Sequence, residues 1–216
     1  MLNPYYTKSE NFVAPTPQQA EAFATGYLDP SFHGRSGPVV NAFPNSYDTF
    51  STAWPSTFAN LGLAWDGDPR EGLALGGGSN LLSLSPINNA RSYAANTYYA
   101  DAKGRPNLTV FTGALAEKVI FSNNLSDGGN LRAIGLQFSH NNSSRTITAK
   151  REVILCGGVF NTPQLLELSG IGNPEILQPL NIDVRVDNPN VGENLQDHLY
   201  VPYACVLHQL LLGSNY

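Results

Sequence analysis

Residues 152–156 form an apolar run that constrains the fold more than any other part of this sequence. The run Glu-Val-Ile-Leu-Cys is followed at once by Gly157 and Gly158. A continuous apolar run that ends in glycine is typical of a β-strand covered on both faces, as in the parallel sheet of an α/β protein. We therefore expect a buried strand here, with Cys156 as an inert thiol in the core.

A helix is expected directly after the two glycines. Thr162 and Pro163 are typical of a helix start. The threonine hydroxyl can cap the first turn. Proline has no N–H, but the N–H groups of the first turn have no partner within the helix anyway. Gly170 marks the end of that helix. Asn173, followed by proline, predicts the start of another short helix. The order strand, glycine turn and helix indicates an α/β arrangement.

The preceding residues have the pattern of an antiparallel β-meander. Alternating apolar residues and short polar turns predict strands over residues 108–111, 115–122, 131–139 and 145–149. Turns are expected at 127–130 and at 141–144, and a further short strand at 182–186. The predicted fold class is therefore α/β, or mixed α+β, with an antiparallel meander next to a buried strand.

The first half of the chain differs, because it is rich in Pro, Gly, Ser and Asn and shows little strand periodicity. Helices are expected in three places, at residues 16–26, 48–60 and 91–102. On this basis the chain divides into a region of helices and long loops at 1–106, the meander with the buried strand at 107–203, and a tail of uncertain structure at 204–216.

Composition excludes several classes of function. Twelve Lys and Arg residues against 17 Asp and Glu residues give a net charge of −5, without a basic cluster in the sequence. Nucleic acids and anionic membrane surfaces both require a basic face, so neither is an expected partner. Asn-x-Ser/Thr triplets are compatible with secretion but do not establish it; they begin at Asn107, Asn124, Asn141 and Asn142.

The run Gly-Val-Phe-Asn-Thr-Pro-Gln-Leu-Leu-Glu-Leu-Ser-Gly-Ile-Gly at 158–172 resembles a signature of the glucose-methanol-choline (GMC) family of FAD-dependent oxidoreductases. The positions that fit are Gly158, Thr162, Pro163, Leu165, Leu166, Ser169, Gly170, Ile171 and Gly172. Val159 departs from the signature, because the family has a smaller residue there. A strand, turn and helix could occur in any α/β protein, whereas this match specifies both ends of the helix. The assignment requires residues 152–156 to be an interior strand.

Other segments resemble the same family in the same order along the chain. They are Asn-Pro-Tyr-Tyr-Thr-Lys-Ser-Glu at 3–10, His-Gly-Arg-Ser-Gly-Pro at 33–38, the stretches 91–94 and 105–108 that lead into the meander, and Val-Gly-Glu-Asn-Leu-Gln-Asp-His at 191–198. The likeness therefore extends over about residues 3–203, nearly the whole chain.

The resemblance implies an enzyme that oxidises an alcohol by hydride transfer from the CH–OH carbon to N5 of FAD. The family's catalytic histidine pair would lie beyond Tyr216, so no catalytic residue is expected in this chain. The Gly-x-Gly-x-x-Gly motif that holds the FAD pyrophosphate is also missing, since the glycines at 76–78 lack a preceding strand and a following helix. The implied fold is an incomplete FAD-binding Rossmann-like domain with a β-meander, plus part of a substrate-binding domain.

Three residues are candidates for contact with FAD. By its position in the family pattern, Ala116 lies on the meander strand whose backbone N–H and C=O meet the adenine. Gly157 and Gly158 would let the backbone come close to the cofactor. An ordinary strand residue and a turn required only by packing are equally good interpretations of these positions. His33 and His198 belong to motif segments, and we interpret them as structural.

The resemblance also predicts that this chain is an internal part of a longer enzyme, which acts on a small-molecule alcohol and is inactive as the isolated chain. We expect the isolated chain to fold poorly and not to hold FAD, because the strand at 152–156 lacks parallel neighbours. A non-catalytic binding or structural module on the same scaffold and a secreted, β-rich glycan-binding protein stay open as alternatives. The identity of the alcohol and of the electron acceptor also stays open.

Overall fold

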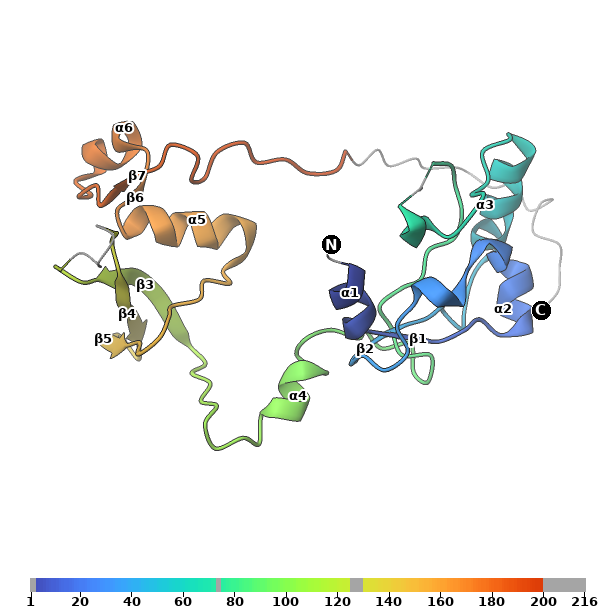
Figure 1. Cartoon of the computed structure of the whole chain (residues 1–216), viewed down its shortest axis with the longest axis horizontal. Helices are drawn as coiled ribbons and strands as arrows, with labels where there is room; N and C mark the ends of the chain where they lie inside the picture. The colour runs from blue at the N-terminus through green and yellow to red at the C-terminus, as the bar shows by residue number, and fades with distance from the viewer. Residues whose placement is uncertain (1–2, 73–74, 125–129, 200–216) are drawn as a thin grey trace. The chain divides into compact units, whose positions relative to one another are not determined.

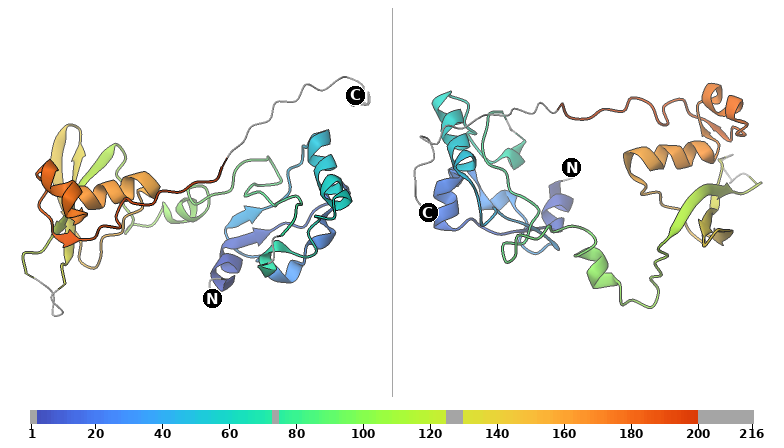
Figure 2. Two further views of the ribbon diagram at one scale, coloured as in Figure 1. Left: turned by 90° about the horizontal axis from the view of Figure 1, so that it is seen from above. Right: turned by 180° about the vertical axis from the view of Figure 1, so that it is seen from behind.

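The computed structural model describes residues 3–72, 75–124 and 130–199, which form two compact units (Figures 1 and 2). The first unit extends to Leu108 and the second begins at Thr109. The tail predicted at 204–216 lies outside the described residues, as does most of the turn predicted at 127–130. The predicted mixed α/β class is confirmed.

The first unit consists of short helices and loops around one pair of short strands. Its helices are α1 (Asn3–Ser9), α2 (Pro17–Ala22), α3 (Thr49–Asn60) and α4 (Tyr98–Ala102), and its 3-10 turns are η1 (Thr25–Tyr27), η2 (Pro30–Phe32) and η3 (Pro69–Glu71). Strands β1 (Glu10–Phe12) and β2 (Val39–Asn41) pair in parallel. Phe12, Phe23 and Phe43 are buried, and the rings of Phe23 and Phe43 stack with centroids 5.0 Å apart.

Local sequence explains where these helices begin. Thr16 caps α2 by accepting from the Gln19 N–H, and the Gln19 side chain accepts from the Thr16 N–H in return, which is a complete capping box. Asp48 caps α3, because its side chain accepts from the Ser51 N–H at 2.8 Å. The helix predicted at 91–102 is shorter than expected, because only α4 is helical there.

The second unit contains the predicted antiparallel meander. Its strands are β3 (Ala114–Phe121), β4 (Ala133–His140) and β5 (Ser143–Thr148), in the spatial order β3-β4-β5. Asn141 and Asn142 form the two-residue turn between β4 and β5 with φ values of 51° and 57°, a conformation that asparagine tolerates better than most residues. The strand predicted at 108–111 does not form.

The rest of the second unit follows the meander. It comprises α5 (Gly158–Leu168), β6 (Ile171–Gly172), α6 (Pro174–Leu177), the 3-10 turn η4 (Gln178–Leu180) and β7 (Val186–Asp187). Helix α5 packs against β3, and β6 pairs in parallel with β7. Gly170, with φ of 86°, ends the α5 region as predicted. The start of α5 was predicted wrongly, because the helix begins at Gly158 and Pro163 lies inside it.

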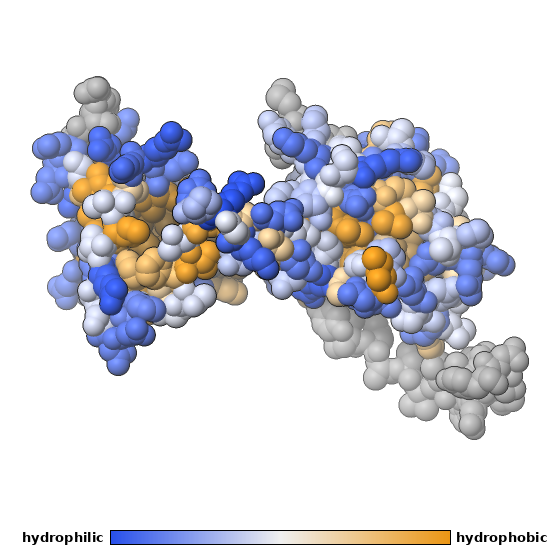
Figure 3. Space-filling model, turned by 90° about the horizontal axis from the view of Figure 1, so that it is seen from below, coloured by the Kyte–Doolittle hydropathy of each residue, from blue (hydrophilic) through white to orange (hydrophobic). Residues whose placement is uncertain are grey.

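The prediction of a buried strand at 152–156 is wrong for this structure. These residues have no regular secondary structure and belong to none of the described strands. Ile154 is 72% exposed and the Cys156 thiol is exposed as well. A two-faced strand becomes buried only when other strands flank it and helices cover it, and no described strand pairs with this run. Figure 3 shows that hydrophobic residues gather on the visible face of each unit.

Candidate cofactor-binding site

Ala116 lies on the edge strand of the meander. It faces Phe138 on β4 and is exposed. The pairing shifts between Ala116 and Lys118, so Glu117 is an extra residue on β3, that is, a β-bulge. The outer edge of β3 borders α5. An edge strand leaves backbone N–H and C=O groups without a partner strand, and such groups can hydrogen-bond to a planar heterocycle.

The glycine pair forms the turn that leads into α5. Gly158 has φ of +78°, and a Cβ built there would have no neighbour within 4 Å. A Cβ on Gly157 would lie 3.0 Å from the Thr162 backbone N, and the Gly157 N–H donates to Thr162 Oγ1 at 3.0 Å. Packing against the first turn of α5 therefore explains Gly157, and backbone conformation explains Gly158. Neither glycine needs a cofactor to account for it.

The glycine pair lies at the start of α5, the helix that packs against the strand of Ala116. Contact between the helix and β3 includes Ser169, which follows the last residue of α5, whereas the glycines lie at the start of that helix. An eleven-residue helix is about 16 Å long. Ala116 is exposed on the edge strand β3, and a Cβ built on Gly158 would have no neighbour within 4 Å.

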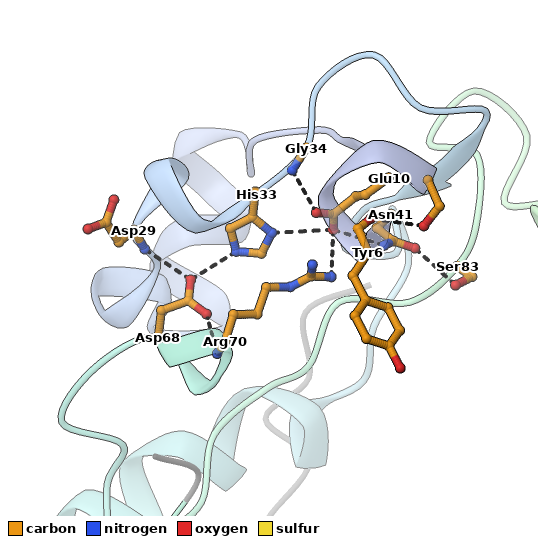
Figure 4. A network of polar contacts seen from close by, with 10 residues as sticks. Tyr6, Glu10, Asp29, His33, Gly34, Asn41, Asp68, Arg70 and Ser83 are labelled. Carbon is orange, nitrogen blue, oxygen red and sulfur yellow. Dashed lines mark hydrogen bonds and ion pairs between the residues drawn. The ribbon is translucent and has the colours of Figure 1, made fainter. Parts of the chain in front are cut away.

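A second polar cluster lies in the first unit, around His33 (Figure 4). The His33 side chain is 1% exposed and lies between two buried carboxylates. Its Nδ1 is 3.3 Å from Glu10 Oε1, and its Nε2 is 2.8 Å from Asp68 Oδ2. Arg70 Nη2 is 2.7 Å from the same Glu10 oxygen. We call these four residues the acid–histidine network.

The network also binds backbone groups, so it joins segments that are distant in sequence. Glu10 Oε2 accepts from the Gly34 N–H at 2.9 Å, and Asp68 Oδ2 accepts from the Asp29 N–H at 3.1 Å. Both ring nitrogens of His33 face carboxylates, which leaves neither of them open to a substrate. The two motif segments at 3–10 and 33–38 are therefore linked by buried contacts. Sequence reasoning singled out His33 but missed Asp68, whose only local signal is the Asp-Pro pair typical of a helix start.

Tyr27 lies in the same unit. Burial, together with the negative charge of Asp68, raises the pKa of Tyr27 to about 12. Its hydroxyl donates to the backbone carbonyl of Ser79. Because the neutral phenol is strongly favoured, Tyr27 is not suited to act as a base at neutral pH.

The other described histidines do not form a catalytic arrangement. His198 is exposed, and its backbone N–H donates to its neighbour Asp197 at 2.7 Å. His140 is at the end of β4, where its Nδ1 lies 3.3 Å from the Gly113 carbonyl. In the part of the chain that the structure describes, no group of three or more His, Cys, Asp or Glu residues could hold a metal ion. Among the same residues, every helix is too short or too polar to cross a membrane.

Comparisons with known proteins agree with this architecture. The sequence pattern of the family named GMC oxidoreductase matches residues 51–200. The glucose-methanol-choline family oxidoreductase mfmG of Annulohypoxylon moriforme is 35% identical over 98% of this chain and 34% of its own length. The oxygen-dependent choline dehydrogenase of Pectobacterium carotovorum is 37% identical over 87% of this chain and 32% of its own length. This chain therefore spans about a third of the curated relatives that it matches.

A solved structure shows the same likeness in three dimensions. The FAD-dependent oxidoreductase of Chaetomium thermophilum superimposes with a TM-score of 0.77 at 31% identity, over 87% of this chain and 31% of that one. The family resemblance expected from the motif at 158–172 is thus confirmed. The expectation that this assignment requires an interior strand at 152–156 is wrong, because the family match holds although Ile154 in this run is 72% exposed. The chain belongs to the GMC oxidoreductase family.

Proposed function

We propose that this chain is the part of an FAD-dependent alcohol oxidoreductase that carries the adenine-contacting strand of the cofactor site. The observation that supports this proposal best is the continuous likeness to GMC oxidoreductases over 98% of the chain. The complete enzyme would oxidise the CH–OH group of a small alcohol and pass the hydride to the flavin, chemistry that FAD supplies when bound.

The residues of this chain would contribute binding rather than proton transfer. The backbone of Ala116 would meet the adenine, and the turn at Gly157 and Gly158 would lie near another part of the cofactor. His33 is enclosed by carboxylates, and His198 is exposed beside an aspartate, so neither is placed as a general base. The groups that take the alcohol proton would come from residues outside this chain.

The first experiment tests the cofactor contact on the full 216-residue chain. Isotope-labelled protein is titrated with FAD and, separately, with FMN, which has the flavin but lacks the adenine. We expect FAD to shift the Ala116 amide resonance at roughly millimolar concentration, and FMN to leave it unchanged. We also expect gel filtration to remove the flavin, because this chain provides only part of a site. Equal responses to FAD and FMN, or stoichiometric yellow flavin after gel filtration, would contradict the proposal.

The second experiment tests the assignment to an enzyme. Transcripts that cover this sequence are mapped, and the longest product is purified with FAD. We expect an upstream Gly-x-Gly-x-x-Gly, a downstream histidine and bleaching of the bound flavin by an alcohol without oxygen. Mature transcripts that end at Tyr216 would instead favour the non-catalytic module.

A further inference from the structure

The β-bulge beside Ala116 is held on both sides by side chains. Bulges bend a strand, increase its twist and redirect the residues next to them. In β3 the extra residue is Glu117, directly after Ala116. The orientation of the exposed Ala116 backbone therefore depends on what holds this bulge in place.

The first contact is made by Glu117 itself. Its Oε2 accepts from Gln137 Nε2 at 3.0 Å and from Ser144 Oγ at 3.3 Å. Gln137 belongs to β4 and Ser144 to β5, so one carboxylate oxygen spans all three strands of the meander. This contact fixes the bulged residue against the sheet.

The second contact lies two residues further along β3. Ser169 is fully buried, and its Oγ accepts from the Val119 N–H at 2.8 Å while it donates to the Leu165 carbonyl at 2.5 Å. The Val119 N–H belongs to an edge strand, and the serine hydroxyl satisfies it in place of another strand. Ser169 thereby fixes the end of α5 to β3.

We propose that Glu117 and Ser169 are positioning residues, which hold the bulge of β3 so that the Ala116 backbone faces the adenine of FAD. This inference rests on the proposed function, in which Ala116 meets the adenine. The two residues act from opposite directions, since Glu117 ties the strand to the sheet and Ser169 ties it to the helix. Ala116 needs no side chain of its own for this role, because the backbone makes the contact.

The test uses the full chain and three variants. Ser169→Ala removes the hydroxyl, Glu117→Ala removes the carboxylate, and Glu117→Gln keeps an oxygen that can accept. Ser143→Ala is the matched control, because it removes an exposed hydroxyl at the first residue of β5. For each protein, the thermal midpoint, the exchange rate of the Ala116 and Val119 amides, and the dissociation constants for FAD and FMN are measured under conditions where the protein is folded.

We expect Ser169→Ala and Glu117→Ala to weaken FAD binding by about tenfold, the effect of losing one good hydrogen bond. The Ala116 amide should exchange faster in both variants, and Glu117→Gln should restore most of the affinity. A purely structural role would lower the thermal midpoint but leave the affinity of the folded protein unchanged, and that result would overturn the proposal. If Ser169→Ala does not fold, the two Glu117 variants decide the question alone.

The design separates two failures. If the unaltered chain does not prefer FAD to FMN, the adenine contact at Ala116 is refuted, and the positioning proposal fails with it. If the unaltered chain prefers FAD and both alanine variants bind it equally well, only the positioning proposal fails.

Discussion

Replacing Glu10 with glutamine tests the acid–histidine network most directly. This carboxylate is 2% exposed and accepts from N–H groups of Gly34, Asn41 and Arg70. His33 Nδ1 lies 3.3 Å from it as well. A glutamine amide has one oxygen and one NH2 group, so at least one of these donors would face another donor. The substitution also removes the negative charge beside Arg70.

The expected loss in the free energy of unfolding follows from the burial of these groups. Removing one partner of a buried ion pair costs about 3–5 kcal/mol, because the remaining groups stay desolvated. Arg70 is 30% exposed and regains water, so most of the loss comes from His33 and the Gly34 N–H. We therefore expect the first unit to lose about 3 kcal/mol or more out of a typical 5–15 kcal/mol. Its thermal midpoint should fall by at least about 10 °C.

Tryptophan fluorescence provides a specific assay. The chain has two tryptophans, Trp54 and Trp65, and both belong to the first unit. Urea unfolding followed by this signal reports on that unit alone. Glu71→Gln is the matched control, since Glu71 is exposed and its loss should change stability by less than about 0.5 kcal/mol. Equal midpoints for Glu10→Gln, Glu71→Gln and the unaltered chain would refute the idea that the network stabilises the fold.

Two further predictions concern the same unit. Gly34→Ala should lower the free energy of unfolding by more than about 3 kcal/mol, because its Cβ would lie 1.8 Å from the Thr7 carbonyl oxygen. Gly26→Ala is the control and should be tolerated, since a Cβ there has nothing within 4 Å. Equal urea midpoints for the two variants would contradict this prediction. The pKa of Tyr27 in the folded chain is about 12, above the ordinary value of 10.0. The neutral phenol therefore contributes its full stabilisation below pH 10, and this stabilisation is lost as the pH rises through about 12. An absorbance titration of tyrosinate should show one late-titrating group that Tyr27→Phe removes, and an unchanged curve would contradict the assignment.

Several local elements could be read from the sequence because their causes are local. The capping box of Thr16 and Gln19 begins α2, and the pair Asn141 and Asn142 forms the turn of a hairpin. Asn173 caps α6 through the Glu175 N–H, as its position before proline indicates. In each case the residues that determine the structure lie within four positions of one another.

The start of α5 shows where local reasoning stops. Thr162 was interpreted as a cap at the helix start, but it lies inside the helix and accepts from the Gly157 N–H. The hydroxyl does satisfy a backbone N–H, but from within the helix rather than from before it. A cap residue and an early helical residue of the same type can make similar hydrogen bonds, so the sequence signal could not distinguish them.

Only the tertiary structure showed that the run at 152–156 is exposed and that the acid–histidine network forms. An apolar run favours an interior strand, but burial requires neighbouring strands, and the described residues provide none for this run. Glu10 and Arg70 are 60 positions apart and meet only because the loops of the first unit bring them together. The sequence by itself determined the family, the meander and the caps of α2 and α6, because those depend on residue type and spacing. Contacts between distant segments depend on the folded chain.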